Sequence, residues 1–192
     1  DAVAQIAISD KFNIWYGWHL PPSDRANLHG PFYSHHWAVF SDSLQDGYPF
    51  LFQGRQNGAT YWGQFGKVKV SAGMYDGSST EIGNSSPSLL TAGRVQVDFW
   101  DPEAGYYLNG TYYGQRNLLA IGLAAQTQAA DVKQVWFGKD GTVAEAQTAN
   151  TASSFDFLLE RMTGNGSAVS LEAEVVRYDG LGGYPTVPGS SY

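Results

Sequence analysis

Residues 2–20 read AVAQIAISDKFNIWYGWHL, and apolar side chains alternate with others on both sides of a short polar step, Ser9–Lys11. In the second arm the two faces differ in chemistry. Large apolar side chains occupy one face (Phe12, Ile14, Tyr16, Trp18 and Leu20), and the other face has Asn13, Trp15, Gly17 and His19. A side-chain period of two predicts β-strands, here joined as a hairpin. Strong apolarity on one face only is typical of a barrel wall between lipid and water.

The same alternation recurs along the chain, so we expect an all-β protein with antiparallel strands and no amphipathic helix. The expected strands are Ala2–Ile8, Phe12–Leu20, Ala59–Phe65, Lys67–Tyr75, Leu89–Trp100, Leu118–Gln126, Ser153–Met162 and Ala168–Tyr178. Most are longer than the roughly 5–6 residues of an ordinary strand. They approach the roughly 9–11 residues that a tilted strand needs to cross a bilayer. We therefore expect residues 1–192 to form one transmembrane β-barrel domain, or a portion of one.

The connections between these strands alternate in length. Short turns are expected at Ser9–Lys11, Gly66 and Thr163–Ser167, and long loops at Pro21–Asn57, Asp76–Ser88 and Thr127–Ala152. Short turns at one end and long loops at the other are typical of outer-membrane barrels, whereas a soluble β-sandwich does not require this segregation. Tyr106–Tyr113 fits either a further strand or an extended turn, and the count of strand directions favours the turn.

Composition narrows the function classes. The net charge of −7 leaves no basic stripe for nucleic acid, and the absence of cysteine excludes disulfides and thiolate metal sites. The longest uncharged apolar run, Leu118–Ala125, is far shorter than the roughly 20 residues of a membrane helix. A barrel stays possible, because its strands are only modestly hydrophobic overall.

Five segments point to one family. They are FNI at 12–14 followed by the prolines at 21–22, GRQNG at 54–58, VSAGMYDG at 70–77, DPEAGYY at 101–107 and LLAIG at 118–122. Together they resemble the phosphate-selective porins of bacterial outer membranes (the OprP/OprO-like porins). The resemblance implies a homotrimer of 16-stranded barrels, each enclosing a water-filled channel narrowed by an inward-folded loop. It also implies passive diffusion of ions and small hydrophilic solutes, with the lipid bilayer as partner and no cofactor.

The chain departs from this family in two ways. It supplies only about eight strands, half of what such a barrel needs, and lacks the terminal aromatic strand, so we expect part of a longer barrel. The expected wall is also acidic, at Asp156, Glu160, Glu172 and Glu174. Phosphate selectivity would require arginines and lysines there, so the resemblance does not extend to anion specificity.

Charges along a water-filled path set the selectivity of a pore. The resemblance implies that residues 21–57 fold inward as a constriction, and the alternative is a solvated external cap. Arg94 and Asp98 share a strand face and lie close enough to pair across Gln96. The candidate pore-lining or constriction residues are Arg25, His35, His36, Arg55, Lys67, Lys69, Arg94, Asp98, Asp156, Glu160, Glu172 and Glu174.

Metal binding and catalysis are weaker interpretations. His35 and His36 offer imidazoles, but adjacent residues of an extended segment point in opposite directions, so we expect no metal site. Glu172 and Glu174 share a strand face and could act as the carboxylate pair of a glycosidase. Such a pair is more often a solvated or lumen surface, so we expect no enzyme.

A different class of function is also compatible with the pattern. A secreted, soluble β-sandwich could bind carbohydrate through the exposed rings of Trp15, Trp37 and Trp62. The two hypotheses differ in extraction behaviour, because a sandwich stays in buffer and a barrel requires detergent.

Overall fold

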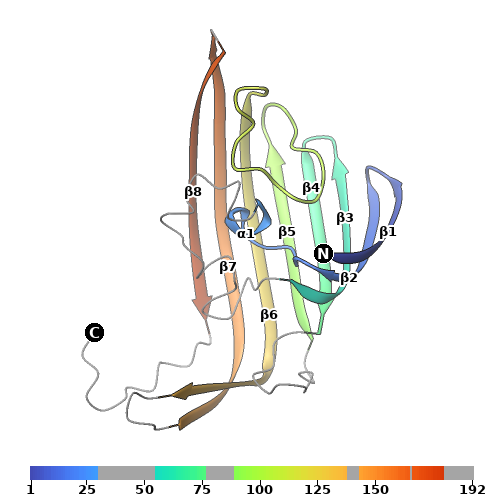
Figure 1. The fold of residues 1–192 in the computed structure, drawn as a ribbon, viewed down its shortest axis with the longest axis vertical. Helices are drawn as coiled ribbons and strands as arrows, with labels where there is room; N and C mark the ends of the chain where they lie inside the picture. Colours follow the sequence, from blue (N-terminus) through green and yellow to red (C-terminus); the bar gives the residue numbers. More distant parts are fainter. Residues whose placement is uncertain (30–54, 77–88, 138–142, 165, 180–192) are drawn as a thin grey trace, which may run out of the picture.

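The computed structural model describes residues 1–29, 55–76, 89–137, 143–164 and 166–179. The all-β expectation is confirmed. Within these ranges, eight strands form one antiparallel sheet in which each strand pairs with its neighbours in sequence. In order they are β1 (Ala2–Ser9), β2 (Phe12–His19), β3 (Gln56–Phe65), β4 (Val68–Tyr75), β5 (Leu90–Asp98), β6 (Leu118–Phe137), β7 (Val143–Gly164) and β8 (Ser167–Asp179) (Figure 1). The described sheet is open, with β1 and β8 at its edges.

Two connections differ from the sequence expectation. Residues 127–152 were expected to be a long loop, but β6 and β7 continue as paired strands to Phe137 and Val143. The apolar alternation stops near Gln126, so a criterion based on apolarity misses this polar extension. The other difference is the connection 99–117, which is long although it lies at the same end of the sheet as the short turns (Figure 1). As expected, Tyr106–Tyr113 within it is not a strand.

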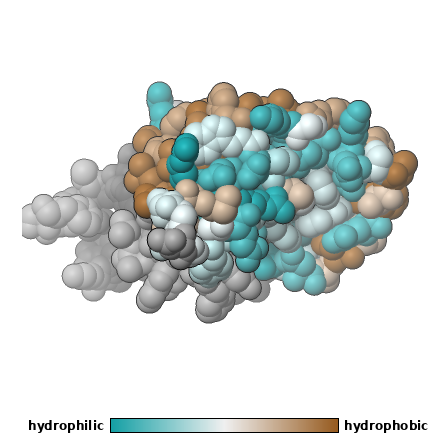
Figure 2. Space-filling model, turned by 90° about the horizontal axis from the view of Figure 1, so that it is seen from above, coloured by the Kyte–Doolittle hydropathy of each residue, from teal (hydrophilic) through white to brown (hydrophobic). Residues whose placement is uncertain are grey.

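The register of the sheet separates two chemically different faces. Large apolar side chains on one face, here called the apolar face, are exposed: Phe155 is 44% and Leu171 is 57% exposed. The opposite face, here called the polar face, has buried polar and charged side chains, including Arg94 and Asp156. Seen along the strands, hydrophobic residues line much of the outer rim and hydrophilic residues gather in the middle (Figure 2). The described part of the sheet is therefore polar where it is covered and apolar where it is exposed.

Two segments cover the polar face. The first follows β2, which ends at His19 because the prolines at 21 and 22 cannot donate ladder hydrogen bonds. Leu20, expected on the apolar face, instead turns inward and is buried with Leu28 and Tyr106. The second segment is the connection 99–117, whose Tyr106 hydroxyl donates to the Leu20 carbonyl at 2.8 Å.

One short helix, α1 (Arg25–His29), interrupts the first covering segment. Asp24 caps it, because its Oδ2 accepts from the backbone N–H of Asn27 at 2.9 Å. The sequence offers this N-cap signal, but the helix has only five residues and no amphipathic period could be recognised. No helix in the described ranges is both long and apolar enough to cross a membrane.

Candidate functional site

A continuous network of charged side chains lies between the polar face and its two covering segments. At its centre Arg25 of α1 forms an ion pair with Glu103 of the connection 99–117, and both side chains are fully buried. Arg25 Nη1 also donates to Glu103 Oε1 at 3.0 Å and to the Asn109 carbonyl at 3.1 Å. Burial alone would raise the pKa of Glu103, but the charge and hydrogen bonds of Arg25 outweigh it and lower this pKa to about 2. Glu103 therefore stays ionised and fixes one covering segment to the other.

A second ion pair connects β5 to β7. Arg94 Nη2 donates to Asp156 Oδ1 at 2.8 Å, and Arg94 Nη1 also reaches Asp156 Oδ2. Strand β6 lies between β5 and β7. It leaves room for the ion pair at Gly122, where a Cβ atom would collide with the Arg94 guanidinium. Arg94 Nη1 also donates to the Ser23 carbonyl at 3.1 Å, and the Arg25 backbone N–H donates to Asp156 at 3.3 Å. The pair thus holds the first covering segment against the sheet.

Gln96 links the two ion pairs. Its amide oxygen accepts from Arg94 Nη2 at 3.2 Å, and its amide nitrogen donates to Asp98 at 2.8 Å and to Glu103 at 2.7 Å. The expected pairing of Arg94 with Asp98 is therefore wrong: the arginine forms its ion pair with Asp156, and Gln96 bonds Arg94 and Asp98 separately. Asp98 also accepts from the backbone N–H of Glu103 at 2.8 Å.

Glu160 of β7 fixes the second covering segment. Its carboxylate accepts from the backbone N–H groups of Tyr112 and Gly114, at 2.9 and 2.8 Å, and from the Thr111 hydroxyl at 2.9 Å. The Ser170 hydroxyl of β8 donates to the same carboxylate at 3.0 Å. This expected wall residue is thus an internal hydrogen-bond acceptor.

The remaining two acids of the expected wall contact α1. His29 Nε2 lies 2.9 Å from Glu172 Oε1, and both side chains are buried. Glu174 Oε2 accepts from the backbone N–H of Ala26 at 3.3 Å. Strand β8 therefore meets the first covering segment through carboxyl groups.

The other candidate residues lie farther from this network or outside the described ranges. Lys69 is buried and donates to the Gly105 carbonyl at 2.8 Å, whereas Lys67 is exposed and donates to the Phe99 carbonyl at 2.7 Å. Arg55 is exposed and forms an ion pair with Asp1. His35 and His36 fall outside the described residues. Sequence reasoning missed Asp24, Gln96 and Glu103, and only Asp24 had a recognisable signal, its position as a helix N-cap.

A cluster of aromatic rings extends the covered surface toward β2 and β3. The Trp15 ring lies 4.8 Å from the Tyr106 ring and 6.1 Å from the Trp62 ring, and Tyr107 packs at 5.5 Å. Trp15 is buried and Trp62 half-buried, so neither is displayed as an open aromatic platform in the described structure. Trp37 falls outside the described residues.

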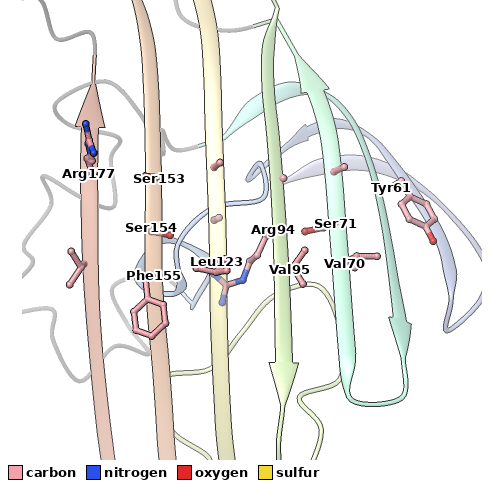
Figure 3. A pocket seen from close by; sticks show the side chains of 15 residues that line it. Tyr61, Val70, Ser71, Arg94, Val95, Leu123, Ser153, Ser154, Phe155 and Arg177 are labelled. Atoms are coloured by element: carbon pink, nitrogen blue, oxygen red, sulfur yellow. The ribbon is translucent and has the colours of Figure 1, made fainter.

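The apolar face contains a shallow hollow of about 810 Å³ (Figure 3). Its floor is a row of small residues in register across four strands: Ala72, Gly93, Ala125 and Ser153. Leu123 and Phe155 form part of one wall, and the Arg94 side chain passes behind the sheet to the polar face (Figure 3). The lining of the hollow is mainly apolar, although serine and arginine residues also contribute to it.

Within the described ranges, no group of three or more histidine, aspartate or glutamate side chains is arranged to hold a metal ion. The ion pairs and hydrogen bonds of the network hold the two covering segments in place against the sheet. No protein-family model, curated protein or solved structure matches the chain.

Proposed function

We propose that this chain forms part of a porin barrel in the outer membrane of a Gram-negative bacterium. Ions and small hydrophilic solutes would cross passively through its water-filled interior, without cofactor or turnover. The proposal includes completion of a 16-stranded barrel by further strands, and assembly as a homotrimer, as the sequence resemblance implies.

The observation that carries this proposal is the inverted distribution of polarity. A soluble sheet buries its apolar face against a second layer, whereas a membrane barrel places that face in lipid and keeps its interior polar. Here Phe155, Leu171 and Val175 are exposed on one face, while Asp156 and Glu160 are buried on the other. In lipid the exposed apolar side chains would contact hydrocarbon, whereas in water they would promote aggregation.

The two covering segments would act as the constriction. They lie on the polar face, which is the face that would line the lumen, and are fixed by the Arg25–Glu103 and Arg94–Asp156 ion pairs. An irregular segment can exist at membrane depth only where protein or a water-filled cavity surrounds it. The described residues 21–29 and 99–117 fit this requirement, because the sheet separates them from the apolar face.

Conductance recording in planar bilayers tests the proposal directly. We expect the full-length protein to give discrete current steps after purification in detergent. The soluble carbohydrate-binding alternative predicts extraction into buffer and no steps. Absence of steps from correctly folded protein would refute the pore.

A further inference from the structure

Two carboxyl groups meet where α1 contacts β8. One oxygen of each accepts a backbone N–H of the helix: Asp24 Oδ2 from Asn27 at 2.9 Å and Glu174 Oε2 from Ala26 at 3.3 Å. The remaining oxygens, Asp24 Oδ1 and Glu174 Oε1, are buried and have no N–H or O–H donor among the described residues. The two carboxyl groups lie close enough to interact directly with each other.

Such a contact requires a proton. An ionised carboxylate is only an acceptor, so two carboxyl groups can hydrogen-bond to each other only when one is protonated. Asp24 is 1% exposed, so water cannot screen a repulsion between two negative charges. Burial accordingly raises the pKa of Asp24.

The surrounding charges do not replace this proton. The charge of Arg94 on β5 acts on Asp24, but this arginine forms its ion pair with Asp156 of β7. Arg25 on the helix pairs with Glu103. Glu172, the neighbouring acid on β8, contacts His29 of the helix.

We propose that Asp24 and Glu174 share one proton, and that this proton holds the segment Pro21–His29 against β8. At higher pH both groups ionise, and their repulsion releases the segment from the strand. The docking contact follows from the geometry of the two carboxyl groups, whereas its consequence for solute passage, a wider path at higher pH, rests on the proposed function.

Proton linkage sets the direction in which pH changes the docking equilibrium. A group whose pKa is raised in the docked state stabilises that state at low pH, and this contribution is lost as the pH rises through the raised value. Between the ordinary pKa of a carboxyl group and the raised one, only the docked state keeps the proton, so release is favoured about tenfold for each pH unit, and above the raised value this dependence ends. The His29–Glu172 contact also joins the helix to β8, so an experiment must separate the two pairs.

Thiol labelling can do this, because the chain has no cysteine of its own. Ala26→Cys places a thiol in the docked segment, where the native side chain is 1% exposed. Asp10→Cys in the exposed turn between β1 and β2 is the reference, since it cancels the pH dependence of thiol ionisation. We expect the maleimide labelling rate at position 26, relative to position 10, to rise with pH by about tenfold per unit at most.

The variants Glu174→Gln and Asp24→Asn test whether the carboxyl pair causes the pH dependence of labelling. Each amide supplies a permanent donor to the remaining carboxylate, so we expect slow labelling of position 26 at every pH. His29→Gln should leave the pH dependence in place. Persistence of the dependence in both amide variants, or its disappearance in His29→Gln alone, would overturn the proposal. Labelling needs no pore, so a protein that shows the pH effect but conducts no current would refute the proposed function and leave the shared proton intact.

Discussion

Gly122 shows how a single residue fixes the interior of this protein. It lies on β6 between Arg94 and Asp156, in register with Gln96 on one side and Asp156 on the other. A Cβ atom at this position would collide with both the Arg94 guanidinium and the Asp156 carboxylate. The guanidinium can therefore cross β6 only because this position has no side chain.

We expect Gly122→Ala to destabilise the fold by about 1–3 kcal/mol, because the added methyl group displaces the ion pair. Gly93→Ala is the matched control. Its Cβ would lie on the apolar face with Ser71 O at 3.6 Å as its nearest contact, which is ordinary packing. Denaturant unfolding in detergent measures both, and equal midpoints for the two variants would contradict the assigned role of Gly122.

A second residue-level prediction concerns Glu103. Glu103→Gln preserves shape but leaves the buried Arg25 without its closest counter-charge. Arg25 Nε remains 3.6 Å from Asp156, so the loss should lie near the lower end of the roughly 3–5 kcal/mol typical of breaking a buried pair. Unfolding free energies of wild type and variant give this difference.

The same difference should depend on pH. The pKa of Glu103 falls from its ordinary 4.5 to about 2 in the folded protein, so its contribution is complete above 4.5. It is lost as the pH falls through that window toward 2, because the folded carboxylate then also takes up a proton. The gap between wild type and Glu103→Gln should narrow over this range, and a constant gap would contradict the ion-pair account.

At the scale of elements, the sequence predicts the strands well because one signal, apolar alternation, dominates. All eight strands expected from alternation are present. The same signal fails where apolarity ends, as in the extension of β6 beyond Gln126. The alternation also places Glu172 and Glu174 correctly on the polar face. It does not predict α1, which covers both residues so that Glu172 is buried and Glu174 half-buried. Contacts between segments distant in sequence, such as Arg25 with Glu103, leave no periodic trace.

A strand-level prediction tests which medium the apolar face meets. Val95 lies near the middle of β5 and is 47% exposed. In lipid, Val95→Arg should cost about 2–4 kcal/mol, whereas a solvent-exposed site tolerates such a change within about 0.5 kcal/mol. Val95→Thr provides a polar control of similar shape. Refolding equilibria into lipid vesicles measure the cost, and near-zero values for both variants would indicate an aqueous face.

At the scale of the whole molecule, the edges of the sheet matter most. In the described structure β1 and β8 each pair on one side only. A bilayer cannot satisfy unpaired N–H and C=O groups, so both edges must find partner strands if the protein spans a membrane. We expect amide hydrogen exchange in peptides from β1 and β8 to be as slow as in β4 and β5 once the full-length protein is in vesicles. Rapid exchange confined to the two edges would argue against a closed wall.

The length of the β6–β7 hairpin has one further consequence. At about 3.3 Å per residue, strands of 20 and 22 residues extend well past the roughly 9–11 residues that cross a bilayer. Their far ends would protrude on the side opposite the tight turns (Figure 1). A peptide epitope inserted there would report sidedness: antibody added to intact cells would reach it only if this end of the protein faces the exterior.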